Sequence, residues 1–265
     1  QAEELNVLTT FKDIDFITTL PLYGYQKVAA AFLDKIESGI LGDEPGSGKT
    51  LVMMALADKF KAKKGLVFCP SVLKWQWASE INKFLPHASV VVIEGTAEER
   101  HKLWQTDSCF YIANYELLLR DFREMSYVDW DYIFADECTR ISNPQAKQSK
   151  AIKKLKAKRR IAASGTPISN KAQDCWNLVD FCHAGAFGNY WNFVNRYCVK
   201  DQWGGIFGYQ NIDELKEKLR RYMIRRLKKD ILPELPDKTE TDVPFVLSDE
   251  EKDLQKKIKK ELLYE

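Results

Sequence analysis

The strongest constraint on this chain is the segment Leu41-Gly-Asp-Glu-Pro-Gly-Ser-Gly-Lys-Thr50, which has the composition of a phosphate-binding loop. Nucleotide phosphates need several backbone N–H donors that converge on one point, and Gly46 and Gly48 let the backbone turn closely around them. In such loops the lysine, here Lys49, reaches the β- and γ-phosphates, and the next hydroxyl, Thr50, binds Mg²⁺. This glycine-rich loop (residues 42–48) therefore predicts a site for a nucleoside triphosphate.

The residues on either side of the glycine-rich loop support this interpretation. Residues 39–41 form a short apolar run typical of a strand. Apolar residues then recur at helical spacing from Val52 to Phe60, so that a helix N-terminus would point at the phosphates. The strict motif has glycine where Asp43 stands, and Gly42 comes one place early. A glycine-rich turn before an ordinary helix is the alternative.

Apolar runs separated by helical patterns follow the loop. We expect strands at residues 66–69, 90–93, 109–113, 132–135 and 160–163. Helices are expected at residues 25–36, at 71–84 with Ser71 as its cap, at 96–104, and from Tyr115 onward. Strands this apolar predict an α/β fold with a mainly parallel sheet, covered by helices on both faces.

Polar residues stand at the ends of these strands, where parallel sheets bind ligands. Asp136 and Glu137 follow one apolar strand, and residues 164–166 (Ser-Gly-Thr) follow another. Asp136 could hold Mg²⁺, and Glu137 could polarise an attacking water. Gln26 begins the helix before the loop, and its amide could read an adenine edge. The alternatives are solvated surface acids and a polar residue at a helix start.

Composition excludes several classes of protein. The net charge is +2, but residues 145–160 and 216–229 hold 16 of the 40 Lys and Arg residues. There is no Cys-x-x-Cys pair, so we expect no structural metal and no disulfide framework, and prefer ordinary thiols to a metal site at Cys175, Cys182, His183 and Cys198. Without a membrane-length apolar run or signal-peptide pattern, we expect an intracellular protein: cytoplasm or nucleoid if bacterial or phage, nucleus if eukaryotic.

Taken together, these blocks resemble the Swi/Snf-type branch of superfamily 2 helicases, which are DNA-dependent ATPases and translocases. The family's own loop carries Asp where the strict motif has Gly. Thr139 stands where the family's Asp-Glu-Ala-His motif has His. The family's coupling from this residue to the γ-phosphate is therefore not expected here, whereas the Mg²⁺ and water roles of the motif are unaffected. The matching blocks run in order through the chain, at residues 22–26, 42–50, 77–84, 113–116, 136–139, 164–170, 178–188 and 224–238.

The resemblance implies ATP and Mg²⁺ as ligands and assigns roles to individual residues. It implies nucleotide binding by Gln26, Asp43, Gly46, Ser47, Gly48, Lys49 and Thr50, catalysis by Lys49, Asp136 and Glu137, and Mg²⁺ binding by Thr50 and Asp136. Coupling of nucleotide state to DNA grip would fall to Ser164, Gly165 and Thr166. DNA backbone contacts would come from Pro70, Ser71, Asn114, Tyr115, Lys147, Gln148, Ser149 and Lys150.

Two groups of basic residues each have two possible roles. The lysines from Lys147 to Lys158 could neutralise DNA phosphates or form a solvated helix face. The run from Arg220 to Lys229 could contact DNA or support a contact between lobes. The tryptophans at 75, 77, 176 and 191 are expected in the core rather than as base-stacking platforms.

The resemblance also implies a domain organisation. Residues 1–20 would lead into a RecA-like ATP-binding lobe at 21–171, followed at 172–265 by a helical addition and a lobe-closing segment. The family's second RecA-like lobe, which supplies arginines to the γ-phosphate, has no counterpart in these residues. We therefore expect the first ATPase lobe of a duplex-DNA translocase, nearly inactive by itself. Alternatives are an RNA- or single-strand-directed helicase lobe, or a nucleotide-binding interaction module without turnover.

Overall fold

The computed structural model describes residues 16–168, 171–203, 205–231, 251, 253 and 254. Contacts divide the chain into two units, Gln1–Leu232 and Pro233–Glu265. In the second unit the described residues are Glu251, Asp253 and the exposed Leu254. The predicted lobe-closing segment at 235–247 lies outside the described residues. The sheet and the candidate site both belong to the first unit.

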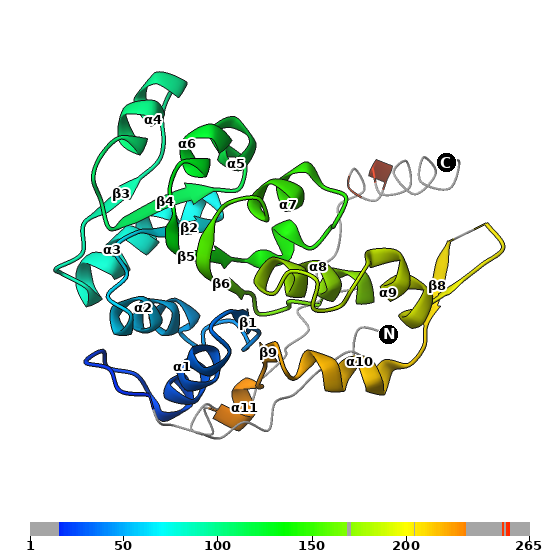
Figure 1. Ribbon diagram of the computed structural model, residues 1–265. Helices are drawn as coiled ribbons and strands as arrows, with labels where there is room; N and C mark the ends of the chain where they lie inside the picture. Colours follow the sequence, from blue (N-terminus) through cyan, green and yellow to red (C-terminus); the bar gives the residue numbers. More distant parts are fainter. Residues whose placement is uncertain (1–15, 169–170, 204, 232–250, 252, 255–265) are drawn as a thin grey trace. The chain divides into compact units, whose positions relative to one another are not determined.

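Within residues 16–231, the described strands build a seven-stranded sheet in the order β3-β4-β2-β5-β6-β1-β9 (Figure 1). Each neighbouring pair is parallel, which confirms the predicted sheet type. The strands are β1 (Gly39–Leu41), β2 (Gly65–Cys69), β3 (Val90–Val92), β4 (Phe110–Asn114), β5 (Trp130–Asp136), β6 (Ala157–Ala163) and β9 (Met223–Ile224). Six of them lie where the apolar runs predicted strands, whereas β9 was not predicted.

Helices cover both faces of the sheet, also as predicted. Successive strand residues point to opposite sides, so strands that are apolar throughout place apolar side chains on both faces. On β5, Ile133 and Ala135 join one buried cluster, while Tyr132 and Phe134 join the other. The second cluster contains residues of α1 (Gly24–Ile36), α2 (Lys49–Lys59) and α3 (Lys74–Phe84). The first contains residues of α4–α8, namely α4 (Ala97–Trp104), α5 (Leu117–Arg120), α6 (Phe122–Ser126), α7 (Lys147–Ile152) and α8 (Ala172–Cys182).

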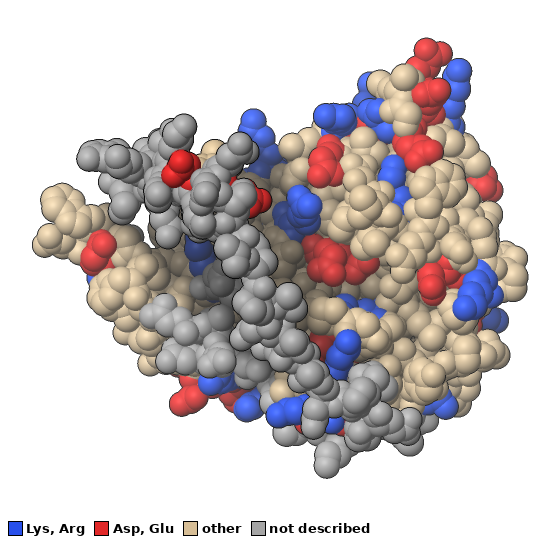
Figure 2. Space-filling model, turned by 180° about the vertical axis from the view of Figure 1, so that it is seen from behind, with Lys and Arg blue, Asp and Glu red and all other residues tan. Residues whose placement is uncertain are grey.

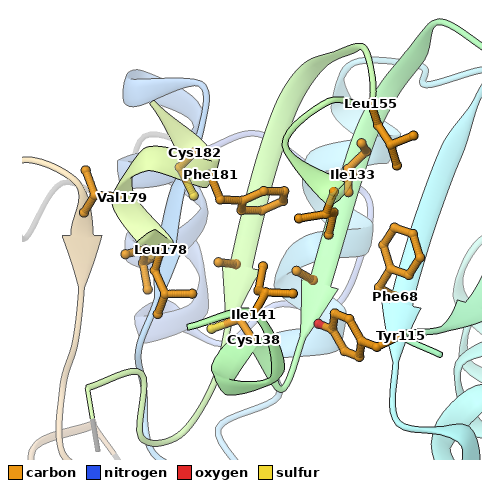
Figure 3. Packing of buried hydrophobic residues seen from close by; sticks show 14 of the residues in the cluster. Phe68, Tyr115, Ile133, Cys138, Ile141, Leu155, Leu178, Val179, Phe181 and Cys182 are labelled. Atoms are coloured by element: carbon orange, nitrogen blue, oxygen red, sulfur yellow. The ribbon is translucent and has the colours of Figure 1, made fainter. Parts of the chain in front are cut away.

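The predicted domain boundary at residue 171 does not separate the sheet from the later residues. Helix α8 packs directly on β1 and β6. Its residue Phe181 is fully buried on the same face as Ile133 (Figure 3). After α8 come α9 (Tyr190–Tyr197), the antiparallel pair β7 (Cys198–Lys200) and β8 (Ile206–Tyr209), α10 (Ile212–Leu219), β9 and α11 (Lys228–Ile231). The residues after 171 thus cover the sheet with α8 and complete it with β9.

Two local predictions were wrong. Ser71 does not cap the long helix, because a short 3₁₀ turn (Ser71–Leu73) intervenes and α3 begins at Lys74. Trp75 and Trp191 were expected in the core, yet each is 61% exposed. Their positions on amphipathic helices explain the error, since one aromatic residue of a helix can face solvent while its neighbours are buried. Trp77, two residues from Trp75, is buried as expected.

Strand β9 brings a distant segment against the glycine-rich loop. Ile224 pairs with Leu41 of β1, so the next residues run beside the loop. Arg225 Nη1 donates to the carbonyl oxygens of Gly42 (3.0 Å) and Gly165 (2.9 Å). Lys228 N donates to Glu44 Oε2 at 2.5 Å. The part of the second basic run that contains Arg225 is therefore bound within this lobe.

The ion pair between Arg226 and Asp43 is the most enclosed of these contacts. The backbone N–H of Arg226 donates to Asp43 Oδ1 at 2.9 Å, and its guanidinium contacts both carboxylate oxygens. Arg226 Nη1 also donates to the carbonyl oxygen of Tyr25 at 2.7 Å. Asp43 is 2% and Arg226 9% exposed, so each charge depends on the other for compensation.

Asp43→Ala should destabilise the fold strongly, because it leaves the Arg226 guanidinium buried without its carboxylate. The expected loss is about 3–5 kcal/mol in the free energy of unfolding, measured by urea denaturation. Glu217→Ala is the matched control, since it removes an exposed ion pair with Arg220 and should cost about 0–1 kcal/mol. Equal losses in the two variants would contradict a structural role for the buried pair.

Candidate nucleotide site and nucleic-acid face

The glycine-rich loop connects β1 to α2 and turns through two left-handed glycines. Gly46 has φ 81° and Gly48 has φ 74°, a region that side chains rarely adopt. Space is also restricted at Gly48, because a Cβ there would lie 2.3 Å from Gln26 Nε2; one on Gly46 would lie 3.1 Å from Lys228 Nζ, at the end of a flexible side chain. Helix α2 begins directly after Gly48, so its free N–H groups lie at the loop.

The Lys49 ammonium group lies over the loop backbone. Its Nζ donates to the carbonyl oxygens of Asp43 (2.9 Å) and Glu44 (3.2 Å). Burial lowers the pKa of Lys49, and the negative charges of Glu137 and Asp136 oppose that shift. The half-buried ammonium group of Lys49 thus lies next to the glycine-rich loop, within the electrostatic influence of the Glu137 and Asp136 carboxylates.

Asp136 is the last residue of β5, and each of its carboxylate oxygens accepts a hydrogen bond. Oδ2 accepts from Trp77 Nε1 at 2.9 Å, and Oδ1 accepts from the backbone N–H of Glu137 at 3.0 Å. The Tyr115 hydroxyl donates to its carbonyl oxygen at 2.8 Å. Burial raises the pKa of the Asp136 carboxyl, while the Trp77 hydrogen bond acts in the opposite direction.

Glu137 takes a left-handed backbone conformation, with φ 50° and ψ 54°. Non-glycine residues in this region carry strain, and such residues concentrate at functional sites. The turn directs its carboxylate to Ser164, whose Oγ donates to Glu137 Oε2 at 3.3 Å. The same Oγ accepts from the backbone N–H of Thr166 at 3.2 Å. Ser164 therefore contacts the carboxylate expected to activate water, and Thr166 is linked to that carboxylate through Ser164.

Gly165, the third predicted coupling residue, packs against the glycine-rich loop. A Cβ on Gly165 would lie 2.5 Å from the Pro45 ring, so the close approach of this ring requires glycine at position 165. Arg225 links them further through its hydrogen bonds to Gly42 and Gly165. Residues 169–170 of this motif lie outside the described residues.

The glycine-rich loop, the start of α2, helix α3 and the end of β5 surround a cavity of about 410 Å³, large enough for a nucleotide. Among the described residues it is lined by Gln26, Pro45, Gly46, Gly48, Lys49, Thr50, Leu51, Leu73, Gln76, Trp77, Glu80, Phe84, Asp136 and Glu137. Thr50 and Asp136 supply the oxygen ligands that Mg²⁺ prefers. The side chain of Asp43 does not line the cavity, because it faces Arg226.

Two polar side chains of the site retain hydrogen-bonding capacity. Ser47 Oγ is buried and has no partner among the described residues. Gln26 accepts from the backbone N–H of Tyr23 (2.9 Å) and donates to the carbonyl oxygen of Ser47 (3.1 Å). One N–H and one lone pair of the Gln26 amide remain for another partner. The donor and acceptor set thus fits a nucleotide with Mg²⁺.

The predicted nucleic-acid contacts divide into accessible and enclosed residues. Ser71, Lys147 and Lys150 are exposed, and Pro70, Asn114 and Gln148 are partly exposed. Two predictions need correction. Tyr115 is 2% exposed, with its ring stacked on Phe68 and its hydroxyl on Asp136, so its side chain is not available to DNA (Figure 3). Ser149 is fully buried and donates to the carbonyl oxygen of Ile141 at 3.0 Å.

The lysines from 147 to 158 do not form one uniform set. Lys153 Nζ is bound to Asp180 (2.8 Å) and Asn177 (2.9 Å), which fixes α7 to α8. Lys158 pairs with Asp131 at 2.7 Å. Over the coloured part of the face in Figure 2, basic and acidic side chains are interspersed. Any DNA contact in this run therefore depends on particular lysines, such as Lys147 and Lys150.

Neither a membrane span nor a metal cluster occurs in the described part of the chain. No helix there is both long and apolar enough to span a bilayer. The same residues contain no group of three or more His, Cys, Asp or Glu side chains able to hold a metal. Cys182 Sγ and His183 Nε2 instead contact the carbonyl oxygens of Gly39 (3.4 Å) and Ser38 (2.5 Å).

Some residues of the site were not found from sequence. Trp77 was assigned to a helix, to the core and to the matching block at residues 77–84, but the sequence gives no sign that its N–H meets Asp136, 59 residues away. The Arg226 partner lies 183 residues from Asp43, beyond any local pattern. Gln76 lines the cavity without a motif to mark it, whereas Glu80 falls in the matching block at residues 77–84. The residue pattern predicted the helix at 71–84, but only the resemblance, through the block at residues 77–84, connected it with function.

Comparison with known proteins identifies relatives of this chain. A family model described as SNF2-related domain matches residues 23–265. The chain is 32% identical over 251 residues to an uncharacterised ATP-dependent helicase of Mycoplasma genitalium, covering 91% of this chain and 24% of that protein. It is 30% identical over 259 residues to the TATA-binding protein-associated factor mot1 of Schizosaccharomyces pombe, covering 86% and 13%. The chain thus spans a quarter or less of the length of these relatives.

Two solved structures of proteins from Sulfolobus solfataricus are similar to the structure of this chain. The SWI2/SNF2 ATPase core in complex with dsDNA has a TM-score of 0.69 and 34% identity, and the match covers 89% of this chain and 50% of that one. The SWI2/SNF2 ATPase core domain has a TM-score of 0.70 and 31% identity, with 97% and 55% covered. With the family match over residues 23–265, these similarities show that the chain belongs to the SNF2-related domain family, as a RecA-like lobe of the Swi/Snf type.

Proposed function

We propose that this chain is the first ATPase lobe of an ATP-dependent duplex-DNA translocase that acts inside the cell. One observation carries the proposal: the glycine-rich loop, Asp136 and Glu137 surround the same 410 Å³ cavity, although they lie far apart in sequence. Ser164 donates a hydrogen bond to Glu137 and accepts one from the backbone N–H of Thr166, which connects that cavity to the segment expected to sense DNA. The similar ATPase core bound to dsDNA favours duplex DNA as the partner.

In the proposed reaction, ATP is hydrolysed by a water molecule. Glu137 accepts a proton from the water, whose oxygen forms a bond to the γ-phosphorus as the bond to the bridging oxygen breaks. Lys49 and the N–H groups of the loop offset the charge on the phosphates. Mg²⁺, held by Thr50 and Asp136, would supply further charge compensation when bound.

The proposed site is complete only with a second lobe. Among the described residues no arginine lines the cavity, because Arg225 and Arg226 are bound behind the loop. In related phosphoryl transfers an arginine from a partner is worth roughly 10³–10⁵ in rate. We therefore propose that a second RecA-like lobe supplies it. The 265 residues alone should then hydrolyse ATP slowly.

Lys49→Ala should remove most of the affinity for ATP–Mg²⁺, because it eliminates the charge-assisted interaction with the phosphates within a rigid loop. Titration of the chain with a fluorescent ATP analogue measures the dissociation constant. Lys154→Ala is the control, since Lys154 is exposed on the segment after α7 and should leave affinity unchanged. Equal affinity in the parent and Lys49→Ala chains would refute the phosphate-binding role of the loop.

Glu137→Gln should retain nucleotide binding and lose turnover, because an amide cannot accept the proton of the attacking water. We expect a decrease in kcat of about 10²–10⁴-fold, measured by steady-state ATPase assay in the full-length protein that carries this chain. Glu98→Gln, an exposed acid on α4, should behave as the parent. Turnover within a few-fold of the parent would exclude Glu137 as the base, and absent turnover in the parent would favour a nucleotide-binding module.

Lys147→Ala combined with Lys150→Ala should weaken duplex binding equally for different sequences, because these exposed lysines would contact phosphates rather than bases. The salt dependence of log K should become shallower by up to about 1.8, or about 0.9 for each phosphate that is no longer neutralised. Lys156→Ala with Lys158→Ala is the control, since both lysines face aspartates. An unchanged slope would contradict the contact, and tighter binding to RNA or single strands would favour those partners.

A further inference from the structure

The indole of Trp77 is placed to act on the site rather than merely to fill the core. It is 2% exposed and lines the cavity. Its single donor, Nε1–H, is directed to Asp136 Oδ2 at 2.9 Å. An indole can donate but not accept, so this hydrogen bond is the one polar contact that the ring can make. The partner is the carboxylate proposed to hold Mg²⁺.

The hydrogen bond from Trp77 completes the fixation of the Asp136 carboxylate. The other oxygen, Oδ1, already accepts the backbone N–H of Glu137 at 3.0 Å. With one oxygen bound by each donor, rotation of the carboxylate about its Cβ–Cγ bond would break both hydrogen bonds. Each oxygen keeps a further lone pair, whose direction is then fixed relative to the loop.

The indole is itself held by the same strand that carries Asp136. The Trp77 ring stacks on Phe134, with ring centroids 6.4 Å apart and an interplanar angle of 21°. Phe134 precedes Asp136 by two residues on β5, so both side chains project from the same face of the sheet. Stacking therefore sets the position of the indole N–H relative to the carboxylate.

We propose that Trp77 is a positioning residue for the nucleotide-bound Mg²⁺, which it serves by orienting the Asp136 carboxylate. The proposal rests on the proposed function of the site. Residues that hydrogen-bond to a metal ligand orient it, and their loss typically lowers metal affinity by about 10–100-fold. The indole of Trp77 has this relation to Asp136.

Trp77→Phe tests the proposal, because phenylalanine retains an aromatic ring against Phe134 but lacks the N–H. The chain is titrated with Mg²⁺ at a fixed concentration of fluorescent ATP analogue. We expect the Mg²⁺ concentration at half-maximal binding to rise about 10-fold or more. The affinity for the analogue at saturating Mg²⁺ should change far less. Equal Mg²⁺ midpoints in the parent and the variant would overturn the positioning role.

Trp104→Phe is the matched control. Its indole also donates to a buried carboxylate, Asp121 Oδ2 at 3.1 Å, but this pair lies between α4 and α6 and does not line the cavity. Loss of an indole–carboxylate hydrogen bond at this position should leave the Mg²⁺ midpoint unchanged. A shift of the same size in Trp104→Phe would attribute the effect to general loosening of the fold, and would overturn the proposal.

A second measurement observes the hydrogen bond in the parent chain. The sequence has seven tryptophans, and a ¹⁵N-labelled sample gives one indole N–H signal for each. The Trp77 signal is identified by its loss in Trp77→Phe or, if that variant does not fold, by its shift in Asp136→Asn. Adding the nucleotide analogue with Mg²⁺ should shift this signal more than that of Trp104. An unshifted Trp77 signal with analogue bound refutes the proposal, whereas no binding at all refutes the proposed function instead.

Discussion

The buried ion pair between Asp43 and Arg226 is the interaction on which the site most depends. A glycine-rich loop has little side-chain packing of its own, and its two left-handed glycines give it large conformational freedom in isolation. Residues that follow β9 hold the loop in place. Strand β9 pairs with β1, and the residues after β9 bind Gly42, Asp43 and Glu44. A charge pair enclosed to this degree contributes little net stability, but removal of one partner is costly. The geometry of the loop is therefore tied to a segment that lies far along the chain.

The parallel sheet then determines where the other functional groups meet. Strands β1, β5 and β6 are neighbours, and each ends at the same edge of the sheet. The loop follows β1, Asp136 ends β5 and Ser164 follows β6, so three distant segments converge there. Glu137 departs from regular geometry at this edge. Its left-handed backbone directs the carboxylate toward Ser164, at the edge where the three segments meet.

Helix α3 lies between the wall of the cavity and the exposed surface at residues 71–75. One face buries Trp77 against Phe134 and Asp136, at the wall of the cavity. The preceding turn exposes Ser71 and Val72, and Trp75 on the helix is also largely exposed. A helix that contacts the carboxylate proposed to hold Mg²⁺ at one face and solvent at the other is a physical connection between the cavity and the surface predicted to meet DNA. It is a connection by proximity, and coupling through it would require the helix to take two positions.

The sequence by itself determined the elements with strong local signals: six of the seven described strands of the sheet, the parallel α/β class, the loop and the strand-end acids. Apolar runs and glycine spacing carry that information within a few residues of chain. Tertiary structure alone decided the rest. Strand β9 is two residues long, too short for any periodicity, and is defined by its pairing with β1. Asp43 and Tyr115 carry groups that could face a ligand, yet one meets Arg226 and the other Asp136, because buried polar atoms must find partners and those partners came from distant segments.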